Sequence, residues 1–98
     1  MLYAMLAGRA FSHAVRGELE QAVLWIDRAR RSPGAHVLID VIAAVMHGMH
    51  GDDAVARQCA EIARSRAPAI SKDDFFRAFP FRTQVREQFG AMLTKYGF

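Results

Sequence analysis

The sequence has few of the features that mark secreted or membrane proteins. Cys59 is the only cysteine, so the chain cannot form the internal disulfides that are common in secreted domains. No apolar run approaches the roughly 20 residues of a membrane-spanning helix, because Asp40 and His47 interrupt the most apolar stretch, residues 37–49. Residues 1–10 have no basic leader before their apolar residues, unlike a secretory signal. We therefore predict a cytoplasmic protein with no membrane partner.

The sequence also lacks the common catalytic motifs. It has no glycine-rich phosphate loop of the Walker or Rossmann kind, and its serines have no nucleophile-elbow context. The acid pairs Asp52–Asp53 and Asp73–Asp74 each precede an expected helix, where capping and the helix dipole explain them. We predict no enzyme activity and no cofactor.

Histidines are the main candidates for metal ligands. His47 and His50 are three residues apart, so on a helix they could share a metal ion with His13 or Cys59. No paired spacing such as Cys-x-x-Cys supports a site of this kind. Because His13 and His47 also fall at expected packing positions between helices, we predict no metal site.

Small residues recur at a fixed spacing. A shift of 34 residues aligns six identical pairs, namely Ala10 with Ala44, His13 with His47, Gly17 with Gly51, Ala22 with Ala56, Ala29 with Ala63, and Arg30 with Arg64. Alanine at a helix crossing allows close approach, and glycine accepts the positive φ that often ends a helix. The pattern predicts two antiparallel helical hairpins.

Stop signals divide the 98 residues into parts of one all-α domain. We expect repeat 1 at about 1–34, repeat 2 at about 35–69, and a C-terminal helical cap at about 70–98, with a short helix from 72 to about 79 that Pro80 ends and a last helix from about 83 to 96. Ser71 should cap the short helix, with an acid three residues on. The second helix of repeat 2 should bury one stripe, made of Val55, Ala56, Cys59, Ile62 and Ala63.

This period, with glycine at the inner turn and proline after the second helix, resembles the tetratricopeptide repeat (TPR) over residues 1 to about 69. The resemblance implies antiparallel helical hairpins stacked in a superhelix and closed by a C-terminal capping helix. The match is incomplete, because Leu6 and Arg9, and then Asp40 and Ala43, stand where the family often has tryptophan and leucine.

The C-terminal segment carries a second resemblance. The run Phe79-Pro80-Phe81-Arg82, followed by a helix ending in Tyr96-Gly97-Phe98, is similar to the end of bacterial multidomain regulators that join a tetratricopeptide array to an adenylate cyclase or winged-helix domain. This implies the C-terminal sensor or interaction part of a signalling or transcriptional regulator. Since the first helix begins at Leu2 without a polar cap, we expect further repeats upstream or a second protomer against this face.

The net charge of +3 leaves a nucleic-acid-binding domain open as an alternative. Arginines gather at 28–31, at 64–66 and at 82–86. The first two groups fall at expected helix ends, where they complement the helix dipole, and we favour that explanation. A small-ligand sensor with a pocket under the C-terminal segment is the other alternative.

The tetratricopeptide resemblance also implies a concave groove lined by the first helix of each hairpin. We expect seven apolar residues along it: Ala7, Phe11, Val41, Val45, Met49, Phe75 and Phe79. Such a groove suits an amphipathic helix or apolar peptide, although the last helix or a second copy could fill it instead. The leading prediction is a protein–protein interaction or oligomerisation module, whose partner is a protein, a peptide or a second copy in a homodimer. Trp25 is expected to pack against the fold, and if exposed it would mark a binding anchor.

Overall fold

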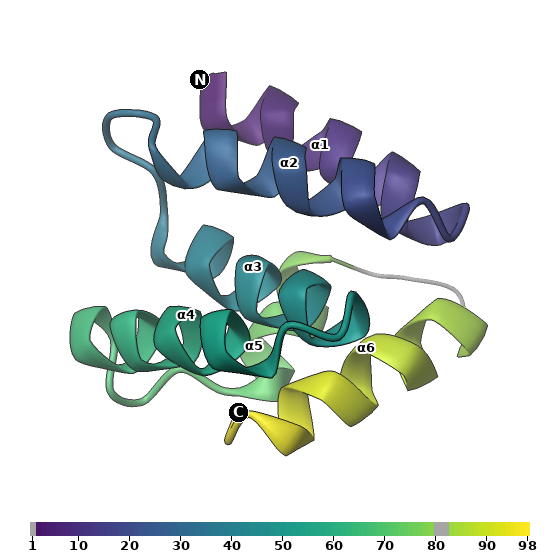
Figure 1. Cartoon of the computed structure of the whole chain (residues 1–98). Helices are drawn as coiled ribbons and strands as arrows, with labels where there is room; N and C mark the ends of the chain where they lie inside the picture. Colours follow the sequence, from purple (N-terminus) through teal and green to yellow (C-terminus); the bar gives the residue numbers. More distant parts are fainter. Residues whose placement is uncertain (1, 80–82) are drawn as a thin grey trace.

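The computed structural model describes residues 2–79 and 83–98, which form helices and turns with no strand among them. The helices are α1 (Leu2–Val15), α2 (Leu19–Arg30), α3 (Val37–Met49), α4 (Asp53–Arg66), α5 (Lys72–Ala78) and α6 (Thr83–Lys95) (Figure 1). The predicted all-α class is confirmed, and α5 and α6 each end one residue before the end expected from the sequence.

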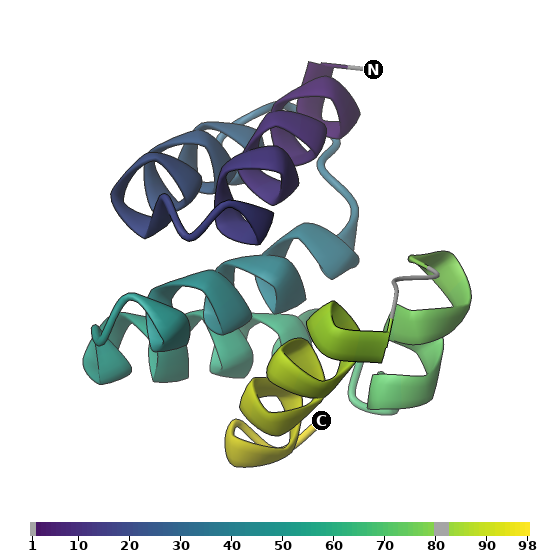
Figure 2. The same ribbon diagram turned by 90° about the vertical axis from the view of Figure 1, so that its right-hand side faces the viewer.

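Two helical hairpins form two layers. α1 packs against α2 in the first layer, α3 packs against α4 in the second, and the layers meet chiefly where α2 lies on α3. Figure 2 shows α5 and α6 beside the second layer, with α6 against α3. α3 is therefore the central helix, and it touches α1 only slightly.

The two inner turns have the same backbone geometry. Gly17 and Gly51 have φ values of +77° and +91°, a region that glycine enters without steric cost. The amide of Glu18 donates to the carbonyl of His13 at 2.9 Å, and the amide of Asp52 donates to that of His47 at 2.9 Å. Each hairpin thus reverses direction through the same hydrogen-bonded turn.

Alanine lines the contacts within and between the hairpins. Seven alanines of the described helices are completely buried: Ala10, Ala22, Ala29, Ala43, Ala44, Ala56 and Ala63. A methyl group at each crossing lets the helix backbones approach closely, so a larger side chain at these positions would force them apart.

The prediction that Ile62 is buried is wrong. Ile62 of α4 is 41% exposed, and the buried positions of this helix are Ala56, Cys59, Ala60 and Ala63. At about 100° per residue, these four share one narrow face, whereas Ile62 falls outside it. α4 lies at the edge of the second layer, so only that narrow face is covered.

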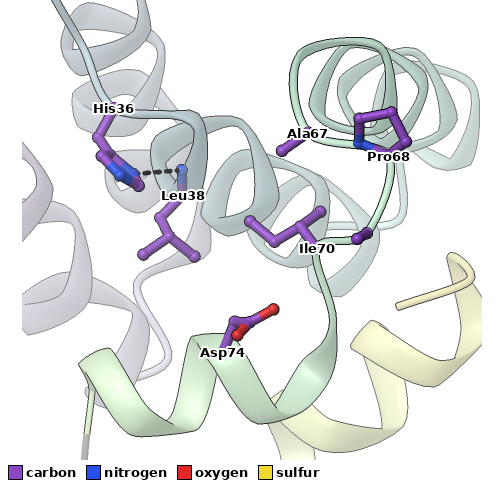
Figure 3. Close-up of a pocket in the computed structure, with 7 residues that line it drawn as sticks. His36, Leu38, Ala67, Pro68, Ile70 and Asp74 are labelled. Carbon is purple, nitrogen blue, oxygen red and sulfur yellow. Dashed lines mark hydrogen bonds between the residues drawn. The ribbon is translucent and has the colours of Figure 1, made fainter.

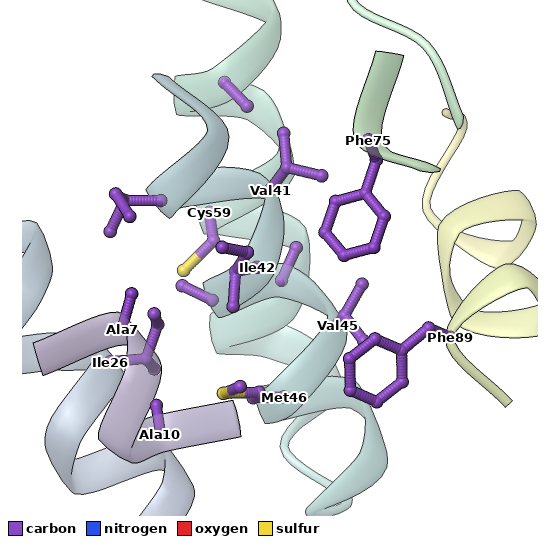
Figure 4. Close-up of a cluster of buried hydrophobic side chains, with 14 of the residues drawn as sticks. Ala7, Ala10, Ile26, Val41, Ile42, Val45, Met46, Cys59, Phe75 and Phe89 are labelled. Carbon is purple, nitrogen blue, oxygen red and sulfur yellow. The ribbon is translucent and has the colours of Figure 1, made fainter. Parts of the chain in front are cut away.

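α3 is buried on all sides. Its residues from Ile39 to His47 are all buried, as the apolar character of the sequence predicts. Figure 4 shows Ile42 and Met46 facing the first hairpin, while Val41 and Val45 face Phe75 and Phe89 of the C-terminal segment. The C-terminal segment therefore supplies the wall that completes the core around α3.

The start of α5 follows the prediction. The side chain of Ser71 accepts from the amide of Asp74, whose carboxylate accepts from the Ser71 amide at 3.0 Å, a capping box. α5 ends at Ala78, and the predicted stop at Pro80 lies outside the described residues, as do residues 80–82 of the Phe-Pro-Phe-Arg motif. Within the part of the chain described, no helix combines the length and the apolar character needed to cross a membrane.

Candidate functional site

Of the seven predicted groove residues, the structure brings six together: Ala7, Phe11 and Phe79 line one recess, Phe75 contacts Phe79, and Val41 and Val45 face Phe75 and Phe89. Four of them are buried, namely Ala7, Val41, Val45 and Phe75, and the other three, Phe11, Met49 and Phe79, are partly buried. The prediction that a partner binds along them stays a prediction, but in this conformation most of their surface is already covered.

Aromatic side chains of the C-terminal segment cover these groove residues. The ring of Phe11 on α1 lies 5.1 Å from that of Phe79 and 5.9 Å from that of Phe89. Phe75 lies 5.3 Å from Phe79 and 6.3 Å from Phe89. Aromatic pairs at such distances contribute about 0.5–1.5 kcal/mol beyond the burial of their area. The middle of the expected groove is thus filled by the chain itself.

Two neighbouring hollows remain where this filling ends. One, of about 450 Å³, lies beside the turn between α4 and α5, the other, of about 400 Å³, lies beside α1, and His36 and Leu38 line both. The one beside α1, which we call the α1 hollow, is lined by Tyr3, Ala4, Ala7, Gly8, Phe11, His36, Leu38, Ile39 and Phe79. Three of the seven predicted groove residues, Ala7, Phe11 and Phe79, are among them.

The α1 hollow exists because the neighbouring face of α1 carries small side chains. Ala4, Ala7 and Gly8 contribute little volume, and a Cβ added to Gly8 would meet no atom within 4 Å. Among the residues that the structure describes, no aspartate, glutamate, lysine or arginine lines the hollow, so these walls offer apolar contact with Tyr3 and His36 as the polar groups.

The other hollow, the α5 hollow, lies over the turn between α4 and α5. Figure 3 shows Leu38 and Ile70 facing it, with Pro68 on the far side and Asp74 below. Nδ1 of His36 accepts from the amide of Leu38 at 3.1 Å, which caps α3 and fixes the imidazole between the two hollows. Asp74 is held by Ser71, so the carboxylate already has hydrogen-bond partners.

A buried charge cluster joins three helices on another side of the molecule. Asp40 of α3, 5% exposed, accepts from Nε of Arg30 at 3.2 Å and from Nη1 of Arg66 at 2.7 Å. Arg66 also donates to the carbonyl of Ala35 at 2.7 Å. Each oxygen of the Asp40 carboxylate accepts one of these hydrogen bonds, so the cluster links α2 and α4 to α3. Asp40 is conspicuous in an apolar stretch of the sequence. Its partners Arg30 and Arg66 could not be predicted, because they lie 10 and 26 residues away.

His47 is part of the same region. Its Nε2 donates to Oδ1 of Asp27 at 3.0 Å, in the first hairpin. Burial acts to raise the pKa of Asp27, but the hydrogen bond with His47 and the charge of Arg30 outweigh it, so the pKa lies below its ordinary value. His47 therefore has a carboxylate partner between the layers, as its expected packing position allows. Among the described residues no group of three or more His, Cys, Asp or Glu side chains could hold a metal ion.

Cys59 is a core residue. Its side chain is completely buried, and burial raises the pKa of its thiol to about 11, although Arg30 acts in the opposite direction. A thiol of this kind is a poor nucleophile at neutral pH.

The end of the chain is fastened to the second hairpin through Tyr96. The hydroxyl of Tyr96 donates to Asp53 at 2.9 Å, and Nη1 of Arg64 donates to the Tyr96 carbonyl at 2.6 Å. The ring is 4% exposed and passes so close to Gly48 of α3 that a Cβ there would lie 2.5 Å from Cε2 of Tyr96. Only glycine leaves room for this contact, which holds α6 against α3.

Neither a family model, nor a curated protein, nor a solved structure matches this chain.

Proposed function

We propose that this chain is a protein-binding module of tetratricopeptide type whose binding surface is the pair of hollows over the start of α3. The observation that carries the proposal is the α1 hollow, an apolar recess with no aspartate, glutamate, lysine or arginine among its described lining residues, at the open end of a groove that the chain otherwise fills itself. A recess lined by apolar side chains fits the apolar residues that an amphipathic helix or extended peptide presents at regular spacing.

The geometry of the two hairpins supports the tetratricopeptide part of the proposal. Two pairs of positions 34 residues apart share the same environment, since Ala22 and Ala56 are both fully buried and Gly17 and Gly51 make the same turn. The slight contact between α1 and α3 is the feature that fits least well, because stacked repeats usually pack neighbouring units together. The assignment to a bacterial cytoplasmic regulator rests on the resemblance of the sequence alone.

A helical peptide display library, selected against the wild-type chain, tests the binding surface. Peptides that use the α1 hollow should carry apolar residues at positions i, i+3, i+4 and i+7. They should lose affinity for Gly8→Phe, which places a ring into the open space beside Gly8. Glu20→Phe, a change at an exposed position of α2, is the matched control and should bind as the wild type does. Selected peptides that bind Gly8→Phe as tightly as the wild type would rule out the α1 hollow as the site.

A small uncharged ligand is the second candidate, because the α1 hollow has the volume and apolar lining of a small-molecule pocket. A screen of uncharged apolar compounds by thermal shift separates the two, since a ligand of the folded state raises the melting temperature. The small-ligand sensor is favoured if a compound raises the melting temperature of the wild type but not of Gly8→Phe, and if the library yields no binding peptide. Light scattering over a concentration series shows whether a second copy occupies the hollow: a dimer that Gly8→Phe dissociates would assign the surface to self-association.

A further inference from the structure

Two arginines lie over the ring of Trp25, on a surface that α1 and α2 share. The guanidinium carbon of Arg9 on α1 lies 4.4 Å from the ring centroid, and that of Arg28 on α2 lies 4.8 Å from it. Cations at these distances are attracted to the face of the indole. The stacking fixes both arginines, whose side chains are otherwise long and mobile.

An exposed apolar side chain stands one turn before each arginine. Met5 precedes Arg9 and is 72% exposed, and Leu24 precedes Arg28 and is 45% exposed. Residues four apart lie on the same side of a helix. The five residues Met5, Arg9, Leu24, Trp25 and Arg28 therefore form one surface, which we call the arginine–tryptophan face.

The two arginines of this face have no carboxylate partner among the described residues. This sets them apart from Arg30 and Arg66, which are both paired with Asp40. The acid on this side of α2, Glu20, lies two turns before Arg28, about 12 Å along the helix. The face thus combines uncompensated positive charge with exposed apolar area.

We propose that the arginine–tryptophan face binds an acidic amphipathic helix of a partner protein. The aliphatic side of such a helix covers Met5, Leu24 and the indole edge, while its carboxylates reach the two guanidinium groups. Arginine and tryptophan are the residues that most often dominate protein interfaces. The stacked guanidinium groups are already ordered, so binding loses less side-chain entropy there than at free arginines.

The apolar residues decide against a nucleic acid, because a phosphate backbone would leave Met5 and Leu24 uncovered. The small number of cations decides against a membrane surface, since stable electrostatic binding to anionic lipid uses clusters of about four to eight basic residues. This inference rests on the proposed protein-binding function, but it uses a surface of its own, distinct from the two hollows.

The fluorescence of Trp25 provides the test, because it is the only tryptophan of the chain. The probes are two tryptophan-free helical peptides with the same leucine stripe, one flanked by glutamate and the other by lysine. We expect a saturable change in emission with the glutamate peptide and at least a tenfold weaker response to the lysine peptide. The double variant Arg9→Gln/Arg28→Gln should weaken binding of the glutamate peptide roughly fivefold, because exposed ion pairs contribute little to affinity.

Three matched variants keep the result specific. Arg9→Lys/Arg28→Lys retains both charges and should retain most of the affinity. Arg86→Gln removes an arginine that stacks 4.3 Å from Phe76 on another side of the molecule, and it should bind as the wild type does. Gly8→Phe should also bind the glutamate peptide normally, so failure at the hollow and failure at this face remain distinguishable.

The proposal is overturned if neither peptide gives a saturable change, if both bind equally, or if the double glutamine variant binds as tightly as the wild type. A response to single-stranded DNA, or to vesicles containing phosphatidylserine, in place of the glutamate peptide would likewise overturn it and would assign the face to a different anionic partner.

Discussion

Gly48 provides the sharpest test of how the C-terminal segment is held. In Gly48→Ala the new methyl carbon would lie 2.5 Å from Cε2 and 2.8 Å from the hydroxyl of Tyr96, closer than real contacts allow. The ring of Tyr96 cannot simply move aside. Its hydroxyl is hydrogen-bonded to Asp53, and the backbone carbonyl of Tyr96 is hydrogen-bonded to Arg64. Either α6 shifts away from α3, or these bonds are lost.

The magnitude follows from opposing terms. Replacing glycine by alanine inside a helix gains about 1 kcal/mol of intrinsic helix stability. Overpacking costs about 1–3 kcal/mol, and the hydrogen bond from Tyr96 to the half-exposed Asp53 would be strained as well. We therefore expect Gly48→Ala to lower the free energy of unfolding by up to about 2 kcal/mol, measured by urea denaturation followed by circular dichroism.

Two other glycines serve as controls for the same substitution. Gly8 also lies within a helix, but nothing surrounds its Cβ position within 4 Å, so Gly8→Ala should stabilise the protein by up to about 1 kcal/mol. Gly90 of α6 would make ordinary contact with Phe76 at 3.7 Å, and Gly90→Ala should be close to neutral or slightly stabilising. In a Tyr96→Ala background the penalty at Gly48 should disappear, as a double-mutant cycle would show. If Gly48→Ala stabilises the wild type as much as Gly8→Ala does, the described contact with Tyr96 is wrong.

Four further predictions concern the core and its charges. Asp40→Ala leaves two arginines without their shared partner and should cost about 2–3 kcal/mol, less than a fully buried pair because one arginine is half exposed; an unchanged urea midpoint would contradict the charge cluster. Cys59 should resist Ellman's reagent at pH 8 in the folded protein and react only on unfolding, since it is buried and its thiol pKa is about 11. Because the pKa of Asp27 is lowered in the folded state, its contribution should be complete above its unfolded pKa of about 4 and lost as the pH falls through the lower folded value; the stability difference between wild type and Asp27→Asn should therefore shrink over that acid range. Ala56→Trp should destabilise by about 1–3 kcal/mol through overpacking, and an unchanged melting temperature would refute the helix crossing assigned to it.

Local signals in the sequence predict the helices well. Gly17 and Gly51 set the inner turns, and Ser71 caps α5, because each acts through residues next to it in sequence. Ile62 was misplaced because a periodic pattern shows that a helix has an apolar side but not how wide its covered face is. That width depends on how many neighbours α4 has, which is a property of the whole fold.

The candidate site is less predictable for the same reason. The groove residues such as Phe11 and Phe79 could be named from the repeat, and the possibility that the chain fills its own groove could be weighed but not decided. The outcome depends on where α5 and α6 pack, and no local rule specifies this for residues so far apart as Phe11 and Phe89. The stacking of Arg9 on Trp25 was likewise hidden, since the two residues come from different helices.

The central position of α3 has a consequence for how the protein is made. A chain emerges from the ribosome from its N-terminus, and early parts begin to fold before later ones exist. The two hairpins can form from neighbouring segments, yet one side of α3 stays open until Phe89, Leu93 and Tyr96 have been synthesised. During that interval Val45, which faces Phe89 in the finished fold, would face water. The nascent chain should therefore bind chaperones that recognise apolar segments, and release from them should coincide with the docking of α6.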